Sequence, residues 1–346
     1  MADKHPLQSC ATCGEISCSN SYARQHKKDS GKVTAYLLDD AWPEYKAYVS
    51  QHMKSGDQLL APGIAGRKAI RRYDWDLSVV HTASVATLLR HATMYLVKNR
   101  RGAERQKSYL YQDSRIAKAL CRHLDYHASH LVISQNYLPW LLSSNLLGGR
   151  TYDVLMTRYP FLSVHQKLDA LAALYPNSAT VTDFRVSDEL VEMEWKALHE
   201  AKHIVTPHYG IASLFSQNAQ LLDWNYPSVI AGRSGERVAF LGPTIARQGA
   251  HWAKEIAQYL TQPLIVFGND LEGVEFWSGV TIERRRMADK EWSDVGIIIH
   301  PAAMTNQPRI LLEAHARGIQ IYTTPESGLA PHQYQPLENF LSATWN

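Results

Sequence analysis

Apolar and polar positions alternate in blocks along most of this chain, and two kinds of block recur. From Lys32 onward, short runs rich in β-branched and aromatic residues are separated by longer stretches in which apolar residues recur every three to four positions. The first kind predicts buried strands, and the second predicts amphipathic helices. Their alternation predicts βαβ units with parallel strands and right-handed crossovers. The predicted strands are residues 33–38, 58–61, 77–81, 108–111, 131–134, 153–157, 179–183, 203–206, 238–241, 264–267, 280–282, 295–299 and 320–323, and the predicted helices include 84–97, 164–174, 187–201, 249–260, 308–316 and 337–343.

Two interruptions of this pattern predict the domain boundaries. Residues 1–31 are polar without a sustained period, and residues 226–236 combine Pro, Gly and Ser with no apolar period. We therefore expect a leader at 1–31, a first Rossmann-like domain at 32–225, a linker at 226–236 and a second Rossmann-like domain at 237–346. The predicted fold class is α/β, with two doubly wound domains facing a cleft that is lined by the carboxyl ends of both sheets.

Composition narrows the class of protein. The 346 residues are 45% hydrophobic and 20% charged, which suits two domains with packed cores. A net charge of +3 does not by itself indicate a nucleic-acid or membrane binder. No apolar run approaches the roughly 20 residues of a membrane helix, and the first residues lack a signal-peptide core, so we expect a cytoplasmic protein.

Three of the four cysteines crowd the N-terminus, at Cys10, Cys13 and Cys18. Cys-x2-Cys is a metal-ligand spacing, because two thiolates on a tight turn can face one tetrahedral ion. A structural zinc would need a fourth ligand, for which His5, His26 and Cys121 are candidates. Because the second Cys-x2-Cys pair is missing, three reduced thiols in a leader are the alternative.

Candidate chemistry follows the strands of the second half. In "VAFLGPTIARQG" a strand ends at Gly242, Arg247 lies in the loop, and Gly249 begins a helix. The free N–H groups and the positive dipole end of that helix suit a diphosphate, and Arg247 adds a guanidinium. An ordinary strand-to-helix turn that needs its glycine is the alternative. The next strand ends at Gly268, followed by Asn269.

The order of segments in this half resembles a known family. The series "VAFLG…RQG", "LIVFGND", "WSDVGIIIHPA", "ILLEAHARGIQIYTT" and "ESGL" is similar to the C-terminal domain of the group 1 nucleotide-sugar glycosyltransferases, which are retaining enzymes of the GT-B fold. The resemblance covers roughly residues 238–329 closely, and residues 32–225 only in architecture. It implies transfer of a sugar from a nucleotide-diphosphate sugar, without a catalytic metal, to an acceptor bound by the first domain.

The resemblance also implies roles for individual residues. Glu313, expected in the first turn of a buried helix, would bind the ribose of the donor; the alternative is an i,i+4 pair with Arg317. The family's second carboxylate corresponds to Thr305, next to Asn306, and its arginine and lysine correspond to Pro243 and Gln248. Arg247 would then stabilise the leaving diphosphate, with Arg309 as a helper. The implied donor-binding residues are Gly242, Arg247, Gln248, Gly249, Gly268, Asn269, Thr305, Asn306, Arg309 and Glu313.

The first half supplies fewer signals. Polar residues after its predicted strands, such as Gln135, Asn136 and Arg158, are expected to face the cleft. A histidine of the family contacts the transferred sugar, and His208 and His81 match by position. The family's glycine-rich loop after the first strand is replaced by "LLDDAWPEY".

The sequence therefore predicts a retaining glycosyltransferase with an unidentified acceptor, whether saccharide, lipid or another small molecule. The alternatives are a GT-B-like binding or scaffold protein without catalysis, and a Rossmann NAD(P) enzyme, although "LGPTIARQG" lacks the Gly-x-Gly-x-x-Gly spacing. Basic clusters in "GRKAIRRYD", "KNRRGAERQK" and "ERRRM" fit a solvated surface or peripheral contact with a membrane. No basic and aromatic run resembles a nucleic-acid module, so nucleic acid is not an expected partner.

Overall fold

The computed structural model describes residues 33–64, 71–75, 81–100, 102–125, 127–228, 235–286 and 292–344. These residues group into two compact units. The first unit takes its described residues from Met1–Phe161, Val186–Thr206 and Gln217–Gln220, and the second takes them from Leu162–Arg185, Pro207–Ser216 and Leu221–Asn346. Two segments from the middle of the chain thus pack with the second sheet.

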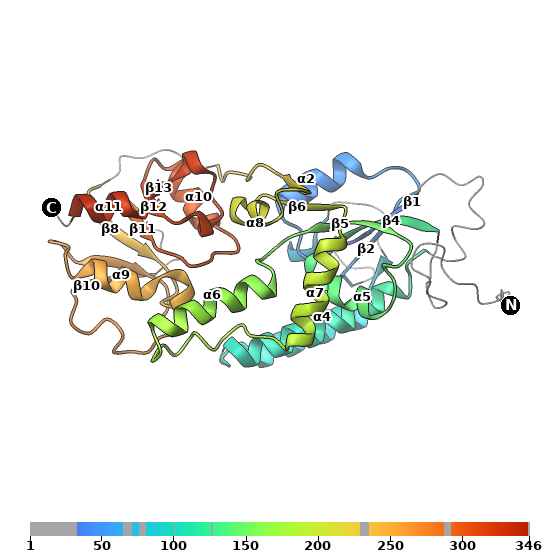
Figure 1. The fold of residues 1–346 in the computed structure, drawn as a ribbon, viewed down its shortest axis with the longest axis horizontal. Coiled ribbons are helices and arrows are strands. Elements are labelled where there is room, and N and C mark those ends of the chain that lie inside the picture. The colour runs from blue at the N-terminus through green and yellow to red at the C-terminus, as the bar shows by residue number, and fades with distance from the viewer. Residues whose placement is uncertain are drawn as a thin grey trace. The chain divides into compact units, whose positions relative to one another are not determined.

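The first unit is built on a sheet in which the described residues form seven strands, in the order β3-β2-β1-β4-β5-β6-β7. Strands β1 to β6 pair in parallel. In Figure 1, α2 lies on one side of this sheet, and α4, α5 and α7 lie on the other. Its elements are β1 (Val33–Leu37), α2 (Pro43–His52), β2 (Gln58–Ala61), β3 (His81–Thr82), α3 (Ser84–Leu96), α4 (Gly102–Cys121), β4 (Ala128–Ser134), α5 (Leu138–Ser143), β5 (Thr151–Leu155), α7 (Asp188–Glu200), β6 (His203–Thr206) and β7 (Ala219–Leu221).

The second unit repeats, with six described strands, the order of the first six strands of the first unit. Its described strands run β10-β9-β8-β11-β12-β13, all in parallel. In Figure 1, α9 and α10 lie on opposite sides of this sheet. Its elements are α6 (Phe161–Leu174, whose first residue belongs to the first unit), α8 (Tyr209–Leu214), β8 (Arg237–Leu241), α9 (Ala250–Ala257), β9 (Leu264–Phe267), β10 (Ile282–Arg285), β11 (Val295–His300), α10 (Arg309–Ala316), β12 (Gln320–Thr323), β13 (Gln335–Pro336) and α11 (Leu337–Thr344).

The cores explain why these strands form. Interior strands are buried at successive positions, Ala35, Tyr36 and Leu37 in β1 and all four residues of Leu264–Phe267 in β9, as expected of parallel strands that are covered on both faces. In the second unit, α9 and Phe340 of α11 pack on one face of the sheet around Phe240 and Ile299. The predicted α/β class with two parallel, doubly wound sheets is confirmed.

Two predicted strands are wrong. Residues 108–111 belong to α4, because "SYLY" lies inside a helix that buries Gln112, Asp113, Ile116, Ala117 and Leu120 at helical spacing. Tertiary packing of that stripe outweighs the local β preference. Residues 179–183 form turns, and their hydroxyls and amides bind a carboxylate instead of a neighbouring strand. The predicted strand 77–81 overlaps β3 only at His81, because residues 76–80 lie outside the described part.

Part of the predicted linker can be placed. Residues 226–228 and 235–236 are described, while 229–234 lie outside the described residues. Across the described ranges, no helix combines the length and apolar character that a membrane crossing requires.

Candidate functional site

The second sheet has a topological switch point between β8 and β11. These neighbouring strands continue to opposite sides of the sheet order, to β9 and to β12. In open α/β sheets, ligands bind outside the carboxyl ends of strands at such a point. The two loops there, residues 242–249 and 301–308, contain the predicted Gly242, Arg247, Gln248, Gly249, Thr305 and Asn306.

The two loops are in direct contact. The N–H groups of Ala303 and Met304 donate to the carbonyl of Arg247, at 3.0 and 3.2 Å. Gly249 has a φ of 83°, and a Cβ at this position would lie 1.9 Å from the Pro301 carbonyl oxygen. Only glycine fits this approach, so the glycine expected at the start of the helix has a packing reason.

A second tight approach fixes the end of β9. Gly268 has a φ of 102°, and a Cβ there would lie 2.0 Å from the carbonyl oxygen of Gly242. The Gly242 N–H donates to Phe267 O at 3.1 Å. Asn269 is exposed, and its carbonyl accepts from Thr244 N–H at 2.9 Å. The next residue, Asp270, accepts from Thr244 and pairs with Arg284.

Arg247 is half-buried, and its side chain has no polar partner among the described residues. Its Cζ lies 4.3 Å from the centre of the Phe184 ring, within cation-π distance. No ion pair or side-chain hydrogen bond to Arg247 is found among the described residues, and its Nε is buried without a partner. Burial lowers the pKa of Arg247 to about 10, against the opposing attraction of Asp183. A desolvated guanidinium of this kind suits an anionic ligand.

Further polar groups follow β11. The Oδ1 atom of Asn306 is buried without a hydrogen-bond partner among the described residues. Arg309 lies over the Trp224 ring at 5.1 Å. Gln248 is half-buried, and its backbone N–H donates to Ile245 O at 3.1 Å. Among the described residues, Arg247 Nε and Asn306 Oδ1 are thus buried polar atoms of these two loops without a hydrogen-bond partner.

Glu272, three residues beyond Asn269, is a site residue that the sequence pattern did not predict. Its carboxylate accepts from Ser178 Oγ at 2.8 Å, from the N–H groups of Ala179 and Ala246 at 2.9 Å each, and from Thr180 Oγ1. Burial alone would raise its pKa, but His251 and the Thr180 and Ser178 hydroxyls lower the pKa of Glu272 to about 2.

Glu272 therefore fixes the loop that carries Arg247. It occupies the Ala246 N–H, one of the amides that a diphosphate could use, and it ties that loop to residues 178–180. The amides of Gly249 and Ala250 donate to Ala246 O and Ile245 O within the same loop. No local pattern predicts this role, because Glu272 lies more than ninety residues from Ser178 and Ala179.

Both ring nitrogens of His208 are hydrogen-bonded to backbone groups. It precedes α8, where its Nδ1 accepts from Ile211 N–H at 3.1 Å and its Nε2–H donates to Thr305 O at 2.6 Å. Thr305 Oγ1 in turn lies 2.9 Å from Nε2 of His300. Burial lowers the pKa of His208 to about 4, so its ring is neutral. This geometry favours a positioning role for His208 and Thr305 at the β11 loop.

His81 lies in the first unit, whereas His208 lies in the second. His81 is exposed at β3, and its ring stacks on His123 with centroids 5.7 Å apart.

Glu313 differs from its expected setting. It is the fifth residue of α10, in the second turn of the helix and not in the first, so the positive dipole end acts on it less than we expected. The side chain is buried, and Oε1 pairs with Arg317 at 3.0 Å. The geometry thus shows the pair that the sequence offered as the alternative to ribose binding.

The predicted metal ligands Cys10, Cys13 and Cys18 lie outside the described residues. The candidate fourth ligand Cys121 ends α4, and burial raises the pKa of its thiol to about 12.

The first unit has buried ion pairs where its own strands end. Asp39, after β1, accepts from Arg90 at 3.0 Å and from Asn136 at 2.9 Å, and Arg90 also pairs with Asp113 at 3.0 Å. Burial by itself raises the pKa of Asp39, but the charge of Arg90 brings it below its ordinary value. Burial raises the pKa of Asp113 to about 7.

A second ion pair, between Arg158 and Glu194, lies where β4 and β5 end. Glu194 of α7 binds Arg158 at 2.7 Å and accepts from Gln135 Nε2 at 3.1 Å. Gln135, Asn136 and Arg158, all predicted to face a cleft, therefore belong to internal networks of the first unit.

Comparisons with known proteins complete the description. No protein-family model matches the chain, and no curated protein sequence matches it. Solved structures similar to the chain include the apo form of the lipopolysaccharide outer core galactosyltransferase WaaB, with 10% identity, coverage of 90% of this chain and 88% of that chain, and a TM-score of 0.45. An α,α-trehalose 6-phosphate synthase from Burkholderia multivorans has 10% identity, coverage of 92% and 91%, and a TM-score of 0.44. LpCGTa in complex with UDP has 13% identity, coverage of 85% and 80%, and a TM-score of 0.40. At these identities and TM-scores, the likeness assigns neither a family nor an activity to the chain.

Proposed function

We propose that this chain is a glycosyltransferase that uses a nucleotide-diphosphate sugar, with its donor site at the β8–β11 switch point of the second sheet. The observation that carries the proposal is Arg247, a half-buried cation with no ion pair to a described residue, fixed against Phe184 beside the N-terminus of α9. A desolvated guanidinium next to helix amides is suited to a diphosphate. Asn306, whose Oδ1 is unsatisfied, adds an acceptor for a donor hydroxyl.

In the proposed reaction, residues 237–346 bind the donor and residues 32–225 provide the acceptor side. The bond between the anomeric carbon and the diphosphate oxygen breaks, and a bond from that carbon to an acceptor hydroxyl oxygen forms with retention. The acceptor proton leaves with the diphosphate. Arg247 stabilises the negative charge that develops on the leaving group, which is the part of the barrier that a fixed cation lowers most.

Glu313 and the glycines have different places in this proposal. Because Glu313 is paired with Arg317, its ribose contact requires that this pair opens or shares its carboxylate. Gly249 lets the 242–249 loop approach Pro301 closely, and Gly268 lets the end of β9 approach Gly242 closely. His208 and Thr305 orient the β11 loop, and His81 is proposed only as an acceptor-side group.

One observation favours a second candidate, a binding protein without catalysis. The Ala246 N–H already bonds Glu272, and Pro243 and Gln248 stand where the resembled family has basic residues. A protein of this second kind would bind a nucleotide but would not turn it over.

The test is a binding and turnover experiment on matched variants. UDP, GDP, ADP and CDP are titrated against the full chain by calorimetry, and the corresponding sugars are followed for hydrolysis or transfer. We expect one nucleotide to bind, Arg247→Ala to weaken it by at least about 100-fold, and the exposed control Arg286→Ala to bind as the parent does. Binding without turnover supports the second candidate, and equal binding by Arg247→Ala refutes both.

A further inference from the structure

Helix α3 of the first unit presents an apolar face to solvent. Its large side chains are exposed: Val85 by 72%, Leu88 by 49%, Leu89 by 37%, Tyr95 by 68% and Leu96 by 77%. With a step of about 100° per residue, these positions fall in one sector of about 120°. The outward face of α3 is therefore a continuous apolar stripe and not a set of scattered residues.

The face that α3 turns toward the protein carries a buried arginine and a buried threonine beside Ala86. Arg90 pairs with Asp39 and Asp113 at 3.0 Å each, and Thr87 Oγ1 accepts from Gly63 N–H at 3.1 Å. Gln112 of α4 donates to Thr93 Oγ1 at 3.0 Å. An ordinary surface helix has the opposite arrangement, with its apolar side inward.

These inward contacts fix the rotation of the helix. Turning α3 to hide its leucines would pull Arg90 away from the buried carboxylates of Asp39 and Asp113, which leaves the charged Asp39 without its arginine. The apolar stripe is thus a stable feature of the described part of the first unit, and no described residue covers it.

Positive charge lies beside the stripe. The Lys98 ammonium is 4.2 Å from the centre of the Tyr95 ring, so this cation lies at the edge of the apolar face. Lys98 and Arg100 are exposed directly after the helix, and residues 98–107 contain five basic residues and one acidic residue.

We propose that α3 docks on the surface of an anionic lipid bilayer, with its leucines in the headgroup–acyl boundary and Lys98 and Arg100 on the headgroups. A helix of 13 residues is too short to span a bilayer, but it can lie in the plane of the interface. Adjacent basic side chains complement anionic lipids, and Tyr95 is the amphipathic residue type that favours the boundary. The same cations would repel a second copy of this positively charged segment.

The experiment is co-sedimentation of the full chain with vesicles. One set is phosphatidylcholine alone, and the other is equal parts phosphatidylcholine and phosphatidylglycerol. We expect binding to the anionic vesicles that weakens with added salt. The double variant Leu88→Gln/Leu96→Gln should lower the partition coefficient by at least about tenfold, because it removes two apolar side chains from the bound face. Lys98→Gln/Arg100→Gln should lower it on anionic vesicles only.

The control is the double variant Leu174→Gln/Val274→Gln, which changes two exposed apolar residues of the second unit. It should bind vesicles as the parent does. The proposal is overturned if the parent stays in the supernatant with anionic vesicles, or if Leu88→Gln/Leu96→Gln binds equally well. It is also overturned if sedimentation velocity without lipid shows a dimer that this variant abolishes, since a second copy would then be the cover.

Discussion

The ring of Phe184 packs against the guanidinium of Arg247, and the backbone of Phe184 has a positive φ, which phenylalanine rarely adopts. The ring lies 4.3 Å from the guanidinium carbon, and the φ of Phe184 is 66°. A left-handed conformation at a bulky residue carries strain that the surrounding structure must offset, and such strain is concentrated at functional sites. The pairing brings together two chain segments more than sixty residues apart within the second unit.

Removing this ring tests its role. Phe184→Ala should weaken binding of the preferred nucleoside diphosphate by roughly tenfold, because the guanidinium loses its cation-π partner and its fixed position. Calorimetric titration measures the change. Phe184→Tyr, which retains the aromatic face, should bind as the parent does, and an unchanged affinity in Phe184→Ala would mean that the stack has no part in binding.

Gly249 offers a stability prediction with a control in the same unit. Gly249→Ala should lower the free energy of unfolding by about 2 to 4 kcal/mol, because its Cβ would overlap the Pro301 carbonyl and its φ is positive. Gly318 also has a positive φ, of 82°, but a Cβ there meets nothing within 4 Å. Gly318→Ala should therefore cost only about 1 kcal/mol in urea unfolding. Equal costs would show that the loop-to-loop contact is not tight.

The buried histidines predict a pH dependence of stability. Burial lowers the pKa of His208 and of His300 to about 4 each, so both are neutral when folded and take up protons when the chain unfolds. The unfolded state then binds more protons below pH 6.5, and the free energy of unfolding should fall as the pH drops from about 6.5 toward 4.

His208→Gln isolates one of these two protons. The variant should reduce the slope of unfolding free energy against pH by up to about 1.4 kcal/mol per pH unit between pH 6 and 4.5. Urea titrations at several pH values measure it. A slope equal to that of the parent in His208→Gln would contradict the buried neutral ring.

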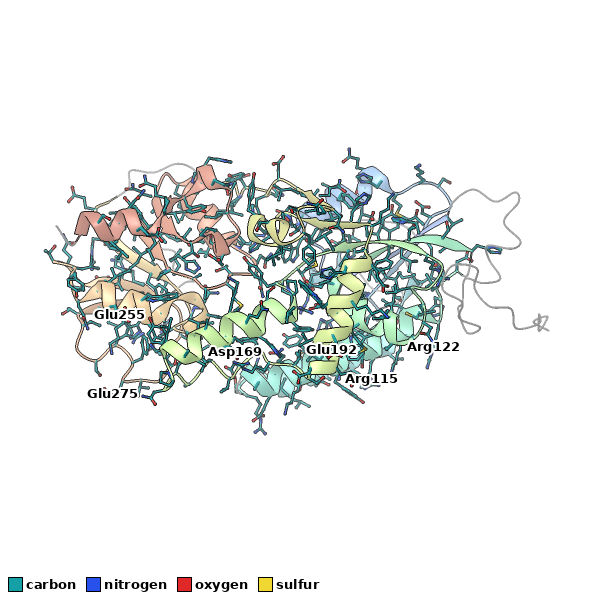
Figure 2. All side chains as sticks on the ribbon, viewed as in Figure 1. Arg115, Arg122, Asp169, Glu192, Glu255 and Glu275 are labelled. Atoms are coloured by element: carbon teal, nitrogen blue, oxygen red, sulfur yellow. The ribbon has the colours of Figure 1, made fainter. Side chains whose placement is uncertain are left out.

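The charged carboxylate of Glu272 is expected to stabilise the fold. Glu272→Gln should lower the free energy of unfolding at pH 7 by about 2 to 3 kcal/mol, because the pKa near 2 reflects stabilisation of the charged form by its donors. This stabilisation is present above pH 4.5 and is lost as the pH falls toward 2. Glu275→Gln, three residues on and exposed, is the matched control (Figure 2). The two variants should differ in urea midpoint.

The two carboxylates around Arg90 should respond unequally to neutralisation. Asp39→Asn should cost about 3 to 5 kcal/mol, because Arg90 loses the carboxylate whose pKa it lowers. Asp113→Asn should cost less than about 1 kcal/mol at pH 7, because burial already raises the pKa of Asp113 to about 7. Circular dichroism during urea unfolding compares them. Equal losses would show that both carboxylates are charged in the folded state.

Much of the secondary structure follows from local pattern. The strand at 264–267 is predicted at its observed bounds, since four consecutive apolar residues between turn residues suit only a buried strand at that length. The strand predicted at 108–111 fails because its residues also fit the buried stripe of a longer helix, and a four-residue window cannot detect that competition.

The candidate site divides in the same way. Arg247 and Gly249 could be proposed from a strand–loop–helix pattern, because the chemistry of an anion site lies within a few residues of chain. Glu272 and Phe184 could not, because each acts on the 242–249 loop from a distant part of the sequence.

By itself, the sequence determined the alternation of strands and helices and the α/β class, since periodicity and apolar runs are local properties of the chain. Only the tertiary structure decided which charges are paired and which face outward. Glu313 meets Arg317, Arg247 is left without a carboxylate partner among the described residues, and α3 turns its leucines to solvent. The physical reason is that burial and ion pairing depend on neighbours in space, which are brought together by the packing of segments that lie far apart in the chain.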